Sequence, residues 1–402
     1  MKIKRTELIV ILGALIAFAP MSIDMYLPAL PTLEQHFAAT TAQVQITLAT
    51  FFFGFALGQA GFGPVMDRYG RKKPLYVGLA LFVVASAGCA VAPSIESLTI
   101  LRLFQAIGAC AGGVASRAMV RDLFEPQEAA RVFSHLLMVM ALAPILAPPL
   151  GGQLLVHFGW PSIFWFKAAV GVIALFGVWS RLPDTHKKEA IRPLALGAAL
   201  STYGNLLRHR LYLGYALSSG FAMAGMFAYI AGSPFAFMQL HGVTPAAYGW
   251  LFGINACGFV VASRINLRLL RRFQAGTILG KAIAAQAIAA AALLVSAATN
   301  LTGLVGLLIP VFVYVSCIGF VVPNATAMAM APHGKVAGAA SAMIGTLQFT
   351  LAASAATLAG AIHDGTAAPM AGVILLCSLM ALAAKAFLVG RTSGQEIAAP
   401  QH

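Results

Sequence analysis

A lone carboxylate, Asp24, lies in the otherwise apolar segment PMSIDMYLPALP, residues 20–31. If this segment crosses a membrane, a charged side chain there costs about 2.5 to 3.5 kcal/mol on insertion scales and usually marks an ion or proton path. The other acidic residues fall between apolar runs or near their ends, and no histidine falls in the middle of a run. We therefore predict that Asp24 carries a proton. The alternative is a structural acid bound to a neighbouring helix.

Two basic side chains have the spacing to approach Asp24. Asp24 lies four residues inside Pro28 and Arg102 lies four residues inside Leu98, so both are about 6 Å below the same surface. Lys167 has a similar depth, but its long side chain can reach outward to the interface. We expect Arg102 to pair with Asp24 and Lys167 to extend outward. Because a nearby cation favours the ionised carboxylate, a movement that separates Arg102 from Asp24 would admit a proton.

The elements that carry these residues are predicted to be membrane-spanning helices. The chain has 402 residues, of which 60% are hydrophobic and 9% charged, against about 25% charged in a soluble domain. A bilayer core about 30 Å thick needs about 20 apolar residues per helix. Twelve runs meet this length: 8–28, 44–66, 74–92, 98–120, 132–157, 163–182, 211–237, 248–270, 277–298, 304–330, 337–362 and 370–389. The sequence thus predicts an all-α, multi-pass membrane protein.

The distribution of basic residues predicts the topology. The net charge of +14 could suggest a nucleic-acid partner, but the six loops on one side of the predicted membrane contain no Lys or Arg, and most of the 26 lie in the loops and tails of the other side. This asymmetry is the positive-inside pattern, which places both termini in the cytoplasm. We therefore expect the lipid bilayer, and no nucleic acid, as a partner.

The longest inward connection, residues 183–210, divides the runs into six and six. Each half has a basic turn after its second run, DRYGRKK at 67–73 and RLLRRF at 268–273, at matching offsets from the start of the half. Such internal repetition is typical of duplicated transporters. We predict a first bundle at 1–182, a cytoplasmic linker at 183–210, a second bundle at 211–390 and a cytoplasmic tail at 391–402.

Several motifs together resemble one transporter family. GPVMDRYGRKKPL (63–75), RLFQAIGACAGG (102–113) and APILAPPLGG (143–152) are similar to the loop, fourth-helix and fifth-helix motifs of the major facilitator superfamily. SIDMYLPALP, MVRDLF, SPFAF and GTLQF resemble its Bcr/CflA drug-resistance branch of drug:proton antiporters. The resemblance implies twelve helices in two pseudo-symmetric six-helix bundles and a proton-coupled drug exporter of the bacterial inner membrane. Ala106, Ala143 and Ala147 depart from the family motifs, which often have glycine there, but alanine still permits close helix approach.

Two further groups of residues are predicted to serve the conformational change. An inner latch is expected from Asp67, Arg71, Arg121 and Asp122; the alternative is a basic anchor at lipid headgroups. Helix pivots, where the helix can bend, or close-packing points are expected at Pro20, Pro28, Pro144, Pro148, Gly151 and Gly152; the alternative is the ordinary tolerance of membrane helices for proline.

The sequence gives the least information about the substrate cavity. Aromatic, Met and amide side chains can repack around varied ligands, and the candidates are Met138, Phe227, Tyr229, Asn255, Gln348 and Phe349. No spare acid accompanies Asp24, so neutral or weakly acidic amphipathic substrates are expected. A narrow exporter of one metabolite is the alternative. We expect a monomer and no metal, cofactor or enzymatic activity, because neither a nucleotide-binding motif nor a metal-ligand cluster occurs.

Overall fold

The computed structural model describes residues 5–182, 196–300 and 302–389. Twelve helical segments in these ranges are long and apolar enough to cross a membrane, which confirms the predicted all-α class. By internal contacts the chain forms two units, one of residues 1–196 with 234–254 and the other of residues 197–233 with 255–402. The predicted division at 183–210 stays a prediction, and residues 183–195 lie outside the described ranges.

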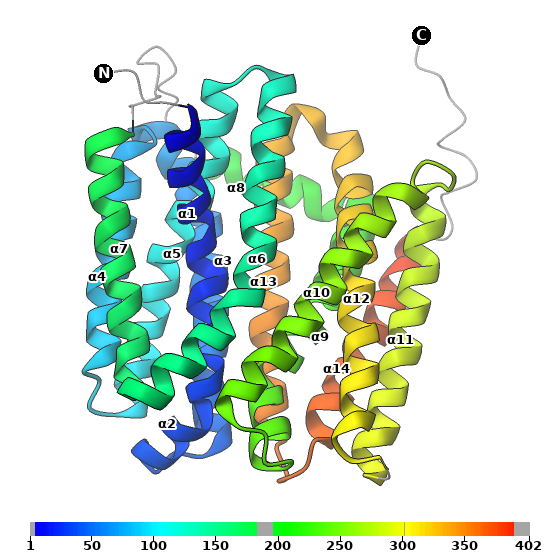
Figure 1. Cartoon of the computed structure of the whole chain (residues 1–402). Helices are drawn as coiled ribbons and strands as arrows, with labels where there is room; N and C mark the ends of the chain where they lie inside the picture. Colours follow the sequence, from blue (N-terminus) through cyan, green and yellow to red (C-terminus); the bar gives the residue numbers. More distant parts are fainter. Residues whose placement is uncertain (1–4, 183–195, 301, 390–402) are drawn as a thin grey trace. The chain divides into compact units, whose positions relative to one another are not determined.

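The first unit is built from long helices that run alongside one another (Figure 1). They are α1 (Arg5–Asp24), the short α2 (Leu30–Phe37), α3 (Thr41–Tyr69), α4 (Lys72–Ala90), α5 (Ile95–Leu123), α6 (Pro126–Phe158) and α7 (Pro161–Arg181). Capping boxes begin α3 at Thr40 with Gln43, and α5 at Ser94 with Ser97. These caps satisfy backbone N–H groups that have no partner inside the helix.

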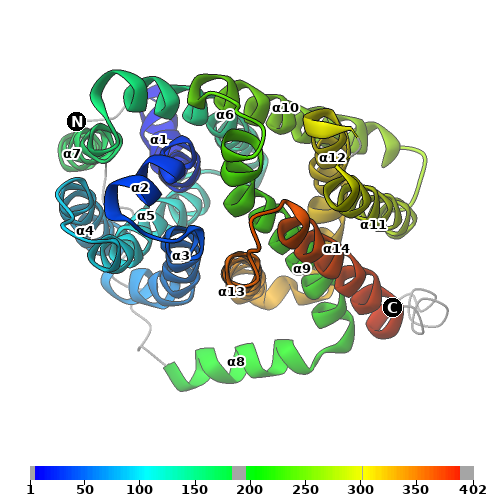
Figure 2. The same ribbon diagram turned by 90° about the horizontal axis from the view of Figure 1, so that it is seen from below.

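Helix α5 lies among α1, α3 and α4, and small residues let it approach them closely (Figure 2). A Cβ atom at Gly108 would lie 2.6 Å from the Gly78 carbonyl oxygen of α4, and one at Gly54 of α3 would lie 2.6 Å from the Leu103 carbonyl oxygen. Larger side chains at these positions would push the helices apart. This packing encloses Arg102, which α5 carries, completely inside the unit.

The first membrane span is not one continuous helix, contrary to the prediction of a run from 8 to 28. Helix α1 ends at Asp24, and a short 3₁₀ segment, Leu27–Ala29, leads into α2. Proline has no backbone N–H, so Pro28 cannot donate the helical hydrogen bond that the Asp24 carbonyl would accept. The predicted bend at Pro28 is therefore a break. Pro20 lies within α1, and α6 continues through Pro144 and Pro148 as an unbroken helix.

The second unit contains helices α8 (Leu196–Arg208), α9 (Arg210–Pro234), the part of α10 (Pro245–Leu269) from residue 255 onward, α11 (Ala275–Thr299), α12 (Gly303–Met330), α13 (Ala337–Ala361) and α14 (Ala368–Ala384). Residues 234–254, with the start of α10, belong to the first unit. The π-helical turns Phe235–Gln239 and Lys385–Val389 follow α9 and α14, and the 3₁₀ turn Ala331–Val336 follows α12. The unit boundaries fall near the end of α9 and inside α10. Leu206 and Tyr203 of α8 pack onto a core that α9, α11, α12 and α13 share.

Candidate functional site

The site is organised around the Ser22 carbonyl oxygen in the last turn of α1. In a continuous helix this oxygen would accept a hydrogen bond from the backbone N–H of Tyr26. After the break, that N–H donates to Ile23 instead, at 3.2 Å. Two buried cations take its place, because Arg102 Nη1 lies 3.1 Å and Lys167 Nζ 3.0 Å from the Ser22 oxygen. Cations are favourable at a helix C-terminus, where carbonyl groups are left without partners.

Arg102 is fixed in place by several further contacts. Its Nη1 also donates to Gln105 Oε1 at 2.7 Å, and Gln105 Nε2 donates to Ser86 Oγ at 2.8 Å. The guanidinium carbon lies 4.4 Å from the ring centroid of Tyr26 and 4.3 Å from that of Phe51, both within cation–π range. In the described part of the chain, Nε and Nη2 have no hydrogen-bond partner.

Lys167 on α7 points into the unit, and the expectation that it extends outward is wrong. Its side chain is 3% exposed, and its ammonium lies 4.8 Å from the ring centroid of Phe164 and 5.6 Å from that of Tyr26. The Ser22 carbonyl and the two aromatic faces give the charge favourable partners inside the protein, which an extended side chain would lose.

Asp24 is the last residue of α1 and is buried, with 4% of its surface exposed. Its carboxylate makes no hydrogen bond or ion pair in the described part of the chain, so the expected direct pair with Arg102 is not formed. Arg102 is instead engaged by the Ser22 carbonyl, Gln105 and two rings. The Lys167 ammonium, which lies 3.0 Å from the carbonyl oxygen of Ser22 two residues before Asp24, is the cation that interacts electrostatically with the carboxylate. The site therefore combines one buried acid, able to take a proton, with two buried cations that share a backbone oxygen.

The aromatic ring of Tyr26, which both cations approach, is also held in place by a hydrogen bond. The Thr47 hydroxyl donates to the Val44 carbonyl oxygen at 2.6 Å, so the Tyr26 hydroxyl is the donor in its 2.8 Å hydrogen bond to Thr47. Tyr26, Ser22 and Gln105 were not among the site residues predicted from the sequence. Gln105 could have been found, because it lies three residues after Arg102 on the same helical face.

Close packing by α6 brings the backbone of a second helix beside the acid. A Cβ atom at Gly151 would overlap the carbonyl oxygen of Met25, the residue after Asp24, and one at Gly152 would lie 2.9 Å from the Pro245 carbonyl oxygen. Both glycines therefore serve as close-packing points within the first unit. Whether they also act as pivots stays a prediction.

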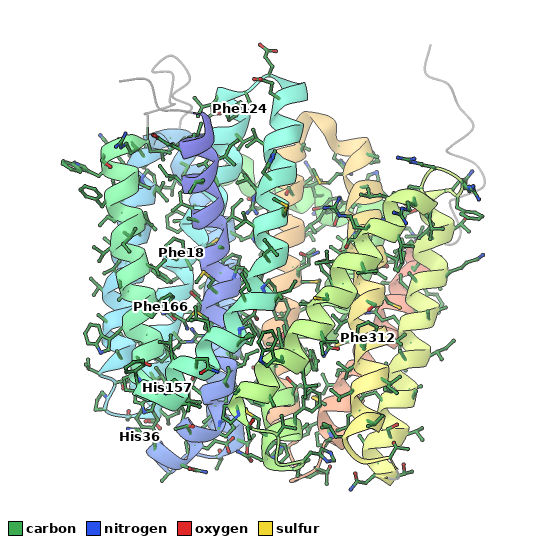
Figure 3. The ribbon with its side chains drawn as sticks, in the orientation of Figure 1. Phe18, His36, Phe124, His157, Phe166 and Phe312 are labelled. Carbon is green, nitrogen blue, oxygen red and sulfur yellow. The ribbon has the colours of Figure 1, made fainter. Side chains whose placement is uncertain are left out.

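One ion pair of the expected inner latch is present. Arg71 Nε lies 2.9 Å from Asp122 Oδ2, with both side chains partly exposed. The side chains of Asp67 and Arg121 lie outside the described residues. Figure 3 labels Phe124, two residues after Asp122, at one end of the first unit, and His36 of α2 at the opposite end. The ion pair and α2, which follows Asp24, thus mark opposite ends of this unit.

Five of the six candidate substrate contacts lie in the second unit. The rings of Phe227 and Phe349 have centroids 5.5 Å apart, and Asn255 Nδ2 donates to the Tyr229 hydroxyl at 2.8 Å. Gln348 Nε2 reaches the Ser219 hydroxyl, at 3.4 Å. The sixth candidate, Met138 of α6, belongs to the first unit and is 49% exposed. Helices α9, α10 and α13 therefore carry two pairs of candidates.

Comparison with known proteins agrees with this architecture. The family model of the Major Facilitator Superfamily matches residues 12–357. A D-xylose–proton symporter structure has a TM-score of 0.72 at 15% identity, covering 95% of this chain and 97% of that one. The xylose transporter XylE from E. coli has a TM-score of 0.73 at 14% identity, covering 98% and 100%. At these identities the structures show the fold alone.

Relatives found by sequence are more similar to this chain than these solved structures are. An uncharacterized MFS-type transporter, YdgK of Bacillus subtilis, is 36% identical, with 94% of both chains covered. The bicyclomycin resistance protein homolog of Haemophilus influenzae is 31% identical, covering 95% of this chain and 96% of its own. The multidrug resistance protein MdtL of Escherichia coli is 28% identical, with 92% of both covered. These relatives confirm the resemblance to the drug-resistance branch, and the chain, a multi-pass membrane protein, belongs to the Major Facilitator Superfamily of transporters.

Proposed function

We propose that this chain is a proton-coupled antiporter that exports drugs or other small amphipathic compounds across the bacterial inner membrane by alternating access. The observation that carries the proposal is Asp24, a buried acid at the break of the first span beside two buried cations. The relatives named for bicyclomycin and multidrug resistance support drugs as the substrate class. With the basic loops inside, both termini lie in the cytoplasm.

Coupling follows from the charge of Asp24. While a buried cation of the site remains near Asp24, its positive charge favours the ionised carboxylate, and when it moves away, burial favours the protonated acid. A substrate that binds one conformation more tightly than the other shifts the equilibrium toward that conformation. The size of the shift is limited by the difference between its two affinities. Exchange results if substrate favours the conformation with ionised Asp24 and its release permits protonation.

The first test is the substitution Asp24→Asn. The amide has nearly the same size but cannot cycle a proton, so uphill efflux driven by a pH gradient should be abolished while the protein still folds and inserts. Efflux of bicyclomycin and of several unrelated neutral drugs from proteoliposomes measures this, with the exposed residue Glu125→Gln as the matched control. Full gradient-driven efflux by the Asp24→Asn variant would disprove the assignment. Transport of one compound alone by the wild type would favour the narrow metabolite exporter.

We also propose that Arg71 and Asp122, together with Asp67 and Arg121, latch the inner face. The 2.9 Å ion pair joins the start of α4 to the end of α5. Because the pair is partly exposed, it contributes at most about 1 kcal/mol, which is still enough to change the ratio of two conformations about fivefold.

Asp122→Asn should therefore change the inward-to-outward population ratio up to about fivefold without changing proton binding at Asp24. Spin-label distances across the inner face measure the ratio, and the charge swap Arg71→Asp with Asp122→Arg should restore part of it. If Asp122→Asn has the same population ratio as the wild type, the latch is contradicted, and the basic anchor at lipid headgroups is favoured instead.

The charges around Asp24 also limit the substrate. Arg102 and Lys167 are both buried, and the one acid beside them is needed for the proton, so a permanent cation would find no spare anion there. We therefore propose neutral or weakly acidic amphipaths as substrates. If one proton enters as one neutral molecule leaves, each cycle carries one positive charge inward. A membrane potential of 100 mV then contributes about 2.3 kcal/mol, or roughly a fiftyfold concentration ratio.

Efflux of a neutral phenicol should consequently speed up as the interior of a proteoliposome is made more negative. The measurement uses potassium-diffusion potentials at fixed pH, with a quaternary ammonium dye as the contrasting substrate. Export of the phenicol that does not depend on the potential, together with strong transport of the dye, would contradict both the stoichiometry and the charge argument.

A further inference from the structure

The coupling scheme needs one cation near Asp24, but the site holds two, Arg102 and Lys167. Arg102 alone would satisfy the Ser22 carbonyl, and burying an additional cation is unfavourable unless partners offset its lost hydration. The Lys167 ammonium has one hydrogen bond, to Ser22, and lies against two aromatic faces. A second buried cation at the same oxygen therefore calls for a role other than capping α1.

The groups that face Lys167 identify that role. They are Asp24 from α1, Tyr26 from the turn after it, Arg102 from α5 and Cys89 from α4. Of these, Asp24 is the acid that is ionised near neutral pH when unperturbed. Arg102 already donates hydrogen bonds to Gln105 and the Ser22 carbonyl and lies against the rings of Tyr26 and Phe51. Lys167, held by the Ser22 carbonyl in the last turn of α1, which ends at Asp24, is thus the cation available to act on Asp24.

We propose that Lys167 is a positioning residue that sets the pH at which Asp24 gains and loses its proton. The inference rests on the proposed proton coupling. The ammonium stabilises the ionised carboxylate through its charge, and its hydrogen bond to the Ser22 oxygen ties α7 to the end of α1. A movement of α7 relative to α1 would change this field, so α7 takes part in proton uptake along with α5.

Infrared titration of the purified protein tests the proposal without requiring transport. The carboxylic acid band that disappears in Asp24→Asn reports protonated Asp24. In Lys167→Met the midpoint of this band should rise by about one pH unit, because an adjacent cation is lost. Lys167→Arg, which retains the charge, should keep the midpoint near that of the wild type. Lys167→Gln, which retains a donor for Ser22 without the charge, should titrate like Lys167→Met and serves if the methionine variant does not fold.

Lys72→Met is the matched control, because Lys72 Nζ likewise donates to a backbone carbonyl oxygen of the first unit, that of Leu182, at 2.8 Å. Its midpoint should equal that of the wild type. Midpoints in both Lys167→Met and Lys167→Gln that match the wild type would overturn the proposal. A wild-type protein with no titrating Asp24 band would instead contradict the proposed proton coupling itself, so the two failures are distinct.

Discussion

The carbonyl oxygen of Ser22 is the group on which the arrangement of the first unit depends. Backbone groups at membrane depth must find partners inside the protein, and the break after Asp24 removes the partner this oxygen would have in a helix. Arg102 and Lys167 supply the replacement from two other helices. A single helix end thereby holds α5 and α7 together and brings two positive charges beside one acid.

Enclosing that charge cluster requires close helix packing. Gly108 and Gly54 bring α5 against α4 and α3, and Gly151 brings α6 against the backbone directly after Asp24. The resulting interior buries Arg102 and Lys167, and electrostatic interactions are stronger in such surroundings than in water. The small residues therefore contribute to the chemistry of the site as well as to the packing, since they keep the charges buried.

Sequence alone predicted the twelve spans, the family and the burial of Asp24, because apolar length and intramembrane charge are properties of single segments. It did not predict which cation would interact with Asp24. Depth along a helix can be estimated from residue number, but the direction of the Lys167 side chain depends on the freed Ser22 carbonyl and on the faces of Tyr26 and Phe164. These are properties of the folded unit. Pro28 was the one visible sign of the break, and it was interpreted as a bend.

The claim that substrate and proton compete through Asp24 is tested most directly by proton release. Purified wild-type protein, equilibrated in weak buffer at a pH where Asp24 is partly protonated, is mixed with bicyclomycin or a neutral phenicol while a pH indicator is followed. The account predicts that protons are released in proportion to the substrate bound, and that the Asp24→Asn variant binds substrate without releasing them. Saturating binding by the wild type with no proton release would contradict it.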